Sequence, residues 1–202
     1  MTPATVWLCC GVLQEEMRQL HRLGEIGGEL LFMDSMLHMH PPELEAVLTE
    51  ILQRRAAEEG CLVLVYGDCS ARMLDLVRRF RVGRVDAINC AQLLLGRERY
   101  RRLMREEAFL VLPEWAGRWE KVIKSELGLN RSVARELMGE NRGVLVYLDT
   151  GLIPVPQLQL EEFSSYTGLP FRVEEVALEH LLAGVRSAEL QAMTTRPGTE
   201  ST

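Results

Sequence analysis

The chain has 202 residues, of which 47% are hydrophobic and 26% are charged, and its formal net charge is -6. This composition is that of a globular protein with enough residues for a sizeable core. The acidic balance argues against broad binding to nucleic-acid phosphates, which requires a basic face. No apolar run approaches the ~18–20 residues of a membrane span. No basic region precedes the N-terminal apolar stretch, as it would in a signal peptide, so we expect a cytoplasmic protein that binds neither nucleic acid nor membrane.

Short apolar runs alternate with segments of helical periodicity along the chain. The predicted strands are 6–10, 30–33, 62–66, 85–88, 109–112, 144–148 and 171–176. The predicted helices are 12–23, 41–59, the segments after Ser70 and Cys90, the segment opened by Pro113, 129–138, 158–166 and 178–190. Such alternation is typical of a parallel sheet covered by helices on both faces. The sequence therefore predicts an α/β fold: one domain over 1–190 with a mainly parallel, doubly wound (Rossmann-like) sheet, and a disordered tail over 191–202.

Potential ligands for a soft metal follow the first four predicted strands. Cys9 and Cys10 close the first strand, while His38, Cys69 and Cys90 follow the next three in turn. The carboxyl ends of parallel strands share one edge of a sheet, where ligands bind in such folds. Thiolate and imidazole are the ligands that zinc prefers. The sequence therefore predicts a metal site, most simply zinc, made by Cys10, His38, Cys69 and Cys90.

The first-strand cysteines are ambiguous, because adjacent side chains in a strand point to opposite faces. Only one of them can face the site, and Cys10 is favoured because the turn residue Gly11 follows it. Cys61 precedes a strand and is interpreted as a core residue. Two alternatives stay open for the whole set: packing as small apolar side chains, and redox pairing of thiols.

Three further polar residues lie beyond predicted strand ends: His40, Glu114 and Asp149. Each is a candidate for cofactor binding, as a fourth ligand, as a partner of a metal ligand or as a proton carrier. Glu114 follows Pro113, so we expect it in the first turn of a helix, where the helix dipole alone favours a carboxylate.

Short motifs carry a resemblance to a known family. They are Cys10-Gly11, Leu37-His38 followed by Pro42, Tyr66-Gly67-Asp68-Cys69, Cys90 followed by Leu93-Leu94-Leu95-Gly96 and Tyr100, and Leu112-Pro113-Glu114-Trp115. In this order they resemble the bacterial and archaeal family called domain of unknown function 1638, over roughly residues 5–185. The resemblance implies a companion of corrinoid-dependent methyl-transfer systems, and hence one-carbon metabolism.

The leading functional prediction combines the metal site with this resemblance. It is a zinc-binding α/β protein that assists or catalyses methyl transfer, with a corrinoid protein or a methyltransferase as partner and a small molecule as a possible substrate. One alternative is a protein that holds an iron–sulfur cluster or delivers a metal for assembly. Another is a non-catalytic α/β interaction scaffold whose buried cysteines are inert.

Overall fold

Two parallel sheets carry the fold, and each lies in its own compact unit of the chain. The first unit combines Met1–Leu93 with Glu179–Thr202, and the second is Leu94–Leu178. The structure, a computed structural model, describes residues 5–56 and 60–195.

The first sheet has the strand order β2-β1-β3-β4, and all its strands are parallel. Its strands are β1 (Thr5–Cys10), β2 (Glu29–Met33), β3 (Cys61–Val65) and β4 (Gly83–Arg84). The two central strands, β1 and β3, are buried along their whole length, as expected for apolar runs covered on both faces. The chain runs from β1 to β2 on one side and then crosses to β3 on the other. The strand order therefore reverses between β1 and β3.

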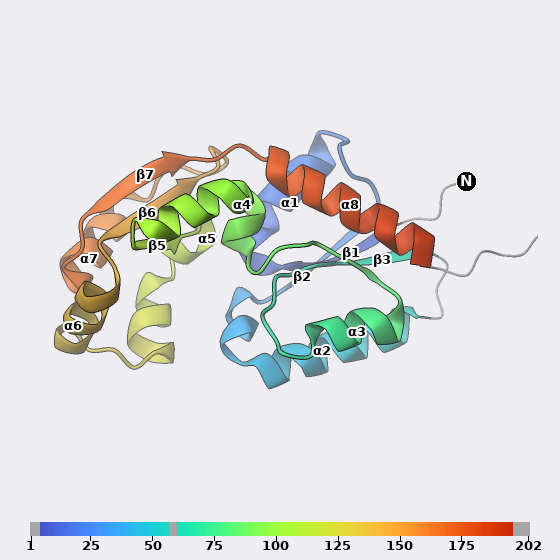
Figure 1. Cartoon of the computed structure of the whole chain (residues 1–202), viewed down its shortest axis with the longest axis horizontal. Coiled ribbons are helices and arrows are strands. Elements are labelled where there is room, and N and C mark those ends of the chain that lie inside the picture. The colour runs from blue at the N-terminus through green and yellow to red at the C-terminus, as the bar shows by residue number, and fades with distance from the viewer. Residues whose placement is uncertain (1–4, 57–59, 196–202) are drawn as a thin grey trace, which may run out of the picture. The chain divides into compact units, whose positions relative to one another are not determined.

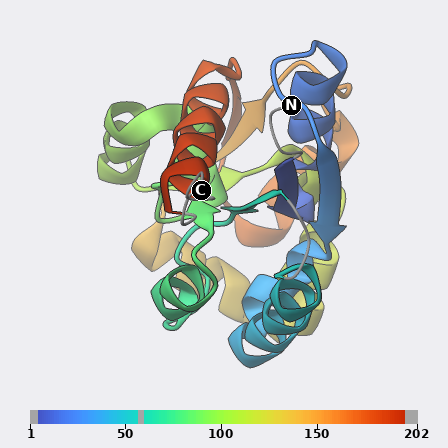
Figure 2. The same ribbon diagram turned by 90° about the vertical axis from the view of Figure 1, so that its right-hand side faces the viewer.

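Helices cover both faces of this sheet (Figures 1 and 2). They are the short helix η1 (Gly11–Leu13), α1 (Gln14–Arg22), the short helix η2 (Ser35–Met39), α2 (Pro41–Arg55), α3 (Met73–Phe80) and α8 (Glu179–Thr195). α1 and α8 lie on one face, and α2 and α3 lie on the other. The prolines at the start of α2 suit a first helical turn. Leu44, Leu48 and Leu52 of this helix, spaced four residues apart, are fully buried and form the stripe that packs inward.

The second sheet has the order β5-β6-β7 and is also parallel. Its strands are β5 (Ala108–Val111), β6 (Val144–Asp149) and β7 (Phe171–Glu175). The associated helices are α4 (Cys90–Arg105), α5 (Pro113–Ala116), the π-helical turn η3 (Lys121–Glu126), α6 (Arg131–Asn141) and α7 (Gln157–Thr167). α4 starts in the first unit, and Gly96, with φ 73° and ψ 164°, interrupts its helical geometry, as the sequence predicted. The side chain of Asn130 caps α6 by accepting hydrogen bonds from the backbone N–H groups of Ser132 and Val133.

The predicted fold class is confirmed: the chain is α/β, with parallel sheets flanked by helices. The strands form two sheets where the alternation predicted one, and the prediction of a single domain over 1–190 stays a prediction. The predicted strand 85–88 is wrong, because β4 pairs with β3 only at Gly83 and Arg84. Val85 and Ala87 are buried by packing instead, which explains the apolar pattern that suggested a strand.

The predicted ends of two helices also change. α2 ends at Arg55, and the last predicted residues of this helix, 57–59, lie outside the described part of the chain. α8 extends to Thr195, so residues 191–195 of the predicted tail are helical, and residues 196–202 lie outside the described part. Among the described residues, no helix combines the length and apolarity needed to cross a membrane.

Candidate functional site

The carboxyl ends of β1 and β3 mark the place where this kind of sheet binds ligands. The chain continues from β1 into α1 on one face and from β3 into α3 on the other. In open α/β sheets, ligands bind outside the strand ends at such a switch point. Cys10 is the last residue of β1, and Cys69 follows β3 by four positions. Two of the predicted ligands therefore lie at the switch point of the first sheet.

The structure brings the thiols of Cys10, Cys69 and Cys90 together. The side chains of Cys90 and Cys10 are hydrogen-bonded, and Cys10 and Cys69 both act electrostatically on Cys90. Cys10 also acts on Cys69. Cys10 and Cys90 are buried, and Cys69 is half-buried. We call these three side chains the thiol cluster.

Gly67 allows the loop that carries Cys69 to lie directly against the segment that carries Cys90. A Cβ atom at Gly67 would lie 2.5 Å from the Cα of Asn89, closer than two such atoms can approach. The contact is reinforced by the backbone N–H of Asp68, which donates to the carbonyl of Ile88 at 2.9 Å. Only glycine, which has no side chain, fits at this position. Gly67 therefore allows the segments that carry Cys69 and Cys90 to pack against each other.

Gly11 plays the same part beside Cys10. A Cβ atom at Gly11 would lie 2.6 Å from the carbonyl oxygen of Met33, the last residue of β2. The end of β1 is thereby packed closely against the end of β2, from which the chain leads into η2 and His38.

Hydrogen bonding and burial raise the pKa of two thiols of the cluster, Cys90 and Cys69. The hydrogen bond with Cys10, followed by burial, raises the pKa of Cys90 well above its ordinary value. Burial, followed by the neighbouring Cys10 thiol, raises the pKa of Cys69 from 9.0 to about 11. Cys90 begins α4, and a helix N-terminus by itself lowers a thiol pKa, but here the hydrogen bond and burial outweigh that effect. Cys69 and Cys90 are therefore neutral thiols at pH 7.

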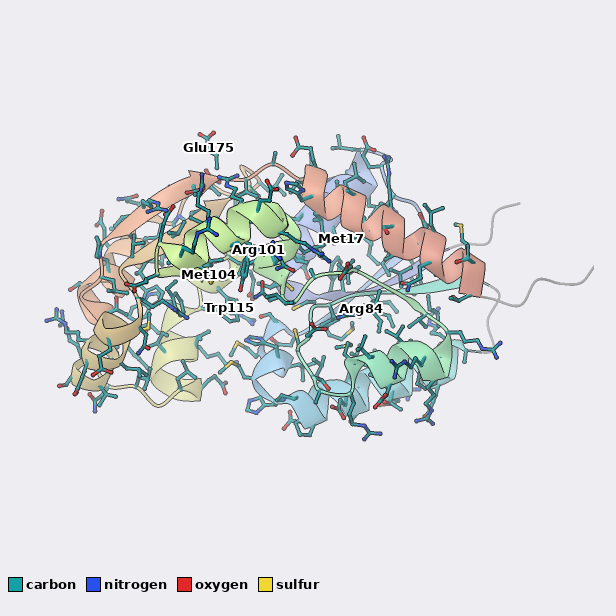
Figure 3. The ribbon with its side chains drawn as sticks, in the orientation of Figure 1. Met17, Arg84, Arg101, Met104, Trp115 and Glu175 are labelled. Atoms are coloured by element: carbon teal, nitrogen blue, oxygen red, sulfur yellow. The ribbon has the colours of Figure 1, made fainter. Side chains whose placement is uncertain are left out.

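Polar groups that were not among the predicted site residues border the cluster. The side chain of Arg84, which is labelled in Figure 3, is 11% exposed. Its guanidinium pairs with Asp68 at 2.8 Å and lowers the pKa of Cys69, although burial outweighs this effect. The hydroxyl of Tyr66 donates to the carbonyl of Cys9 at 3.3 Å, and burial raises the pKa of this tyrosine. Arg84 lies in an arginine-rich stretch of the sequence that also contains Arg78, Arg79 and Arg81. Arg84 differs from these arginines because it lies in β4, opposite Leu64 of β3, and this tertiary contact places it near the cluster.

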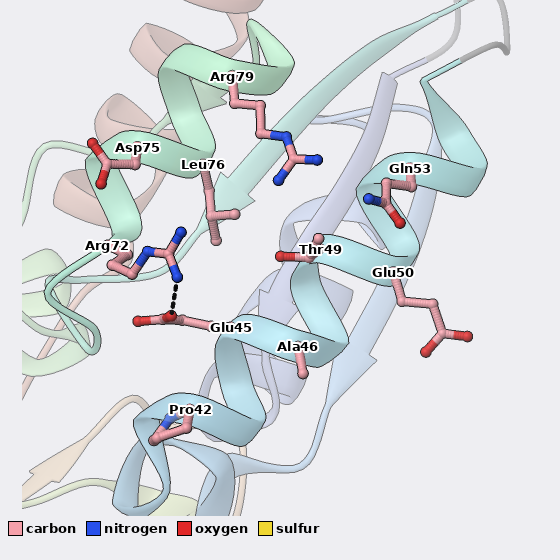
Figure 4. Close-up of a pocket in the computed structure, with 10 residues that line it drawn as sticks. All are labelled: Pro42, Glu45, Ala46, Thr49, Glu50, Gln53, Arg72, Asp75, Leu76 and Arg79. Atoms are coloured by element: carbon pink, nitrogen blue, oxygen red, sulfur yellow. Dashed lines mark ion pairs between the residues drawn. The ribbon is translucent and has the colours of Figure 1, made fainter.

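A second group of contacts ties the loop after Cys69 to α2. The hydroxyl of Ser70 donates to the carboxylate of Glu45 and accepts from the backbone N–H of Arg72 at 3.1 Å. The Arg72 guanidinium lies 3.8 Å from the same carboxylate (Figure 4). Glu45 and Arg72 line a groove of about 740 Å³ between α2 and α3, which Arg79 also lines. Glu45 and Ser70 are 25 residues apart, and no local sequence pattern indicates that they are in contact. Glu45 was therefore not predicted from the sequence.

His38 and His40, the two histidines among the predicted site residues, lie on the segment between β2 and α2. His38 is part of η2, and its Nδ1 atom is hydrogen-bonded with the carbonyl of Ser35. The carbonyl of His40 accepts from the N–H groups of Glu43 and Leu44, so this residue begins α2. Within residues 5–56 and 60–195, no group of three or more His, Cys, Asp or Glu side chains is arranged to hold a metal ion. The zinc set of Cys10, His38, Cys69 and Cys90 therefore stays a prediction.

Glu114 and Asp149 belong to the second unit, at the carboxyl ends of its adjacent strands β5 and β6. Glu114 lies in the first turn of α5, as predicted, and pairs with Arg118 at 3.1 Å. A carboxylate oxygen of Asp149 accepts from the N–H of Gly151 at 2.8 Å and shapes the turn after β6. The cofactor-binding roles predicted for Glu114, Asp149 and His40 stay predictions. Cys61, the first residue of β3, is buried in the core as interpreted.

Comparison with known families decides the relationship that the motifs suggested. The family described as Protein of unknown function (DUF1638) matches residues 32–183, more than half of the chain. The chain belongs to this family. The part matched to DUF1638 starts within β2 and ends within α8, so it contains His38, Cys69 and Cys90, whereas Cys10 precedes it. No curated protein and no solved structure matches the chain.

Proposed function

We propose that this DUF1638 protein binds zinc through the thiol cluster, with His38 as the fourth ligand, and serves methyl transfer in one-carbon metabolism. The observation that supports the proposal is the meeting of Cys10, Cys69 and Cys90 at the switch point of the first sheet. Three sulfurs and one imidazole nitrogen form a ligand set typical of zinc. The link to one-carbon metabolism rests on the family resemblance.

The protonation state of the three thiols affects how tightly the cluster would bind a metal ion. A thiol binds metal as a thiolate, so each ligand must release its proton. The raised pKa of Cys69 and Cys90 makes this release unfavourable without the metal, and the charge of the ion compensates for it. Zinc affinity should therefore rise as the pH rises. The Arg84 guanidinium offsets part of the negative charge that the thiolates bring.

The surroundings of the cluster suit thiolate chemistry. Bound zinc supplies a positive charge that keeps a ligated thiolate deprotonated at neutral pH. Burial of Cys10 and Cys90 limits access of water, and the half-buried Cys69 leaves an approach for a small-molecule substrate or for a protein partner. We propose a corrinoid protein or a methyltransferase as this partner.

Metal analysis of reduced, anaerobically purified protein tests the proposal. Wild type should hold one equivalent of zinc, and Cys69→Ser and Cys90→Ser should lose most of it, because serine is a poor ligand for a soft metal. Cys61→Ser is the matched control, since Cys61 is buried in the same unit at the opposite end of β3. Equal zinc content in all four proteins would contradict the assignment.

The interaction scaffold is the second candidate, and one observation favours it. No group among the described residues is arranged to hold a metal, and neutral, buried thiols also pack well as small apolar side chains. Metal-free wild-type protein that takes up no added zinc would support the scaffold. A broad visible absorption band would instead indicate an iron–sulfur cluster, the metal-assembly alternative.

A further inference from the structure

Two aromatic rings of the second unit hold a positive charge between them. The Lys124 ammonium lies 4.9 Å from the centroid of the Trp119 ring and 5.0 Å from that of Tyr166. Both distances lie within the range of favourable cation–π contacts. The three residues line one surface pocket of about 480 Å³.

The aromatic walls of this pocket are firmly held. Trp119 is 5% exposed, and its ring stacks on Phe163 of α7 with 5.1 Å between ring centroids. The Tyr166 ring lies 5.3 Å from Trp119 at an interplanar angle of 55°, so the two rings form adjacent walls. The hydroxyl of Tyr166 is fixed by donation to the carbonyl of Leu129 at 2.8 Å. Such rings form a preorganised cation site that needs little reorganisation on binding.

The charged residues around the pocket also favour a cation. Three carboxylates line it, against two cationic side chains: Glu120, Glu161 and Glu162 against Lys124 and Arg131. Arg131 donates to the backbone carbonyl and the hydroxyl of Ser165, another residue of the pocket wall. Lys124 is paired with Glu120 from the preceding helical turn. If Lys124 leaves, the rings face a pocket lined mainly by negative charge.

Lys124 itself is weakly held. Its side chain is 40% exposed, and exposed ion pairs and exposed cation–π contacts contribute little stability. Its flexible stem allows the ammonium to move into water, where it is strongly hydrated. It belongs to η3, a π-helical turn, a rare feature that is often found at functional sites.

We propose that this pocket binds a small organic cation of the methylated ammonium class, and that Lys124 occupies the cation position when the ligand is absent. A quaternary methylated ammonium has no N–H group to donate to water, unlike the ammonium of Lys124, so its transfer from water to an aromatic site costs less. The inference concerns a site separate from the thiol cluster and does not depend on the proposed zinc.

Calorimetric titration with tetramethylammonium chloride, at constant total ionic strength, tests the site. Wild type should bind, and Lys124→Ala should bind on the order of tenfold more tightly, because the competing ammonium is removed. Lys121→Ala is the matched control, since it removes an exposed lysine from the same turn, and it should bind as wild type does. Tyr166→Leu should weaken binding, whereas Tyr166→Phe, which keeps the ring, should retain most of it.

A neutral ligand of the same shape separates charge recognition from simple apolar contact. Choline should bind more tightly than 3,3-dimethylbutan-1-ol, in which carbon replaces the charged nitrogen. Equal affinities for the two compounds would overturn the proposal. Absence of tetramethylammonium binding to both wild type and Lys124→Ala, or no gain in affinity on removal of Lys124, would overturn it as well.

Discussion

The proton on Cys69 links the packing of one side chain to the stability of the fold. Burial and the neighbouring Cys10 thiol raise the pKa of Cys69 to about 11 in the folded state, against an ordinary value of 9.0. The folded state therefore holds the proton more tightly than the unfolded state does. The stability contributed by this difference is fully present below pH 9.0 and is lost as the pH rises towards about 11.

We therefore expect the free energy of unfolding of the metal-free, reduced protein to fall between pH 9 and about 11. Urea denaturation at a series of pH values measures this dependence. Cys69→Ser removes one titrating group, so its stability should fall less steeply over the same interval. Parallel curves for the two proteins would show that Cys69 does not carry the raised pKa.

Gly67 gives the second prediction at this scale. In Gly67→Ala the added methyl group would meet the backbone of Asn89, which cannot move aside as a flexible side chain would. We expect a loss of about 1–3 kcal/mol in the free energy of unfolding, measured by urea denaturation. Gly27→Ala is the control, because no atom lies within 4 Å of its added Cβ. A Gly67→Ala variant as stable as this control would contradict the close packing of the two loops.

The strands that are continuous runs of apolar residues could be predicted well from the sequence. The buried runs of β1, β3 and β6 were found from their own residues. β4 has only two paired residues, and what defines it is hydrogen bonding to β3, which no local pattern contains. The thiol cluster was predicted for a similar local reason, because its cysteines follow apolar runs. Glu45 and Arg84 reach the same region through long-range contacts and could not be found this way.

The cap of α6 is testable as a single element. Replacing Asn130 by alanine leaves the N–H groups of Ser132 and Val133 without the side-chain acceptor that they have now. We expect Asn130→Ala to lower the free energy of unfolding by about 0.5–2 kcal/mol, measured by thermal or urea denaturation. Glu136→Ala changes an exposed residue on the same helix and should have a much smaller effect. Equal effects of the two substitutions would argue against the cap.

At the scale of the whole molecule, the chain leaves the first unit after Leu93 and returns to it at Glu179. The returning helix α8 covers β3 and β4, and a Cβ on Gly83 of β4 would collide with the backbone of Ala188 in α8. Alternating apolar runs predict strands but do not state which strands pair. The division into two sheets therefore could not be predicted from the pattern alone.

This arrangement predicts that a change near the C-terminus affects the unit that holds the thiol cluster. Leu181 of α8 is fully buried, and Leu181→Ala should cost about 2–5 kcal/mol of unfolding free energy. Leu190 lies on the same helix and is 64% exposed, so Leu190→Ala should have little effect. Reactivity of the cysteine thiols towards a thiol reagent, followed with the denaturation curve, should increase in Leu181→Ala and not in Leu190→Ala. Unchanged reactivity would contradict the coupling.

The return of α8 also determines the order in which the protein can mature on the ribosome. The second unit is continuous in sequence and has all its residues once Leu178 has emerged. The first unit contains every cysteine of the chain, yet it lacks a covering helix until the last segment has been synthesised. All five cysteines are therefore synthesised before α8, the last helix that covers the first sheet. At a synthesis rate of about 5–20 residues per second, the roughly 100 residues from Cys90 to the end of α8 take about 5–20 s, and during this time α8 does not yet cover the sheet that carries the thiol cluster.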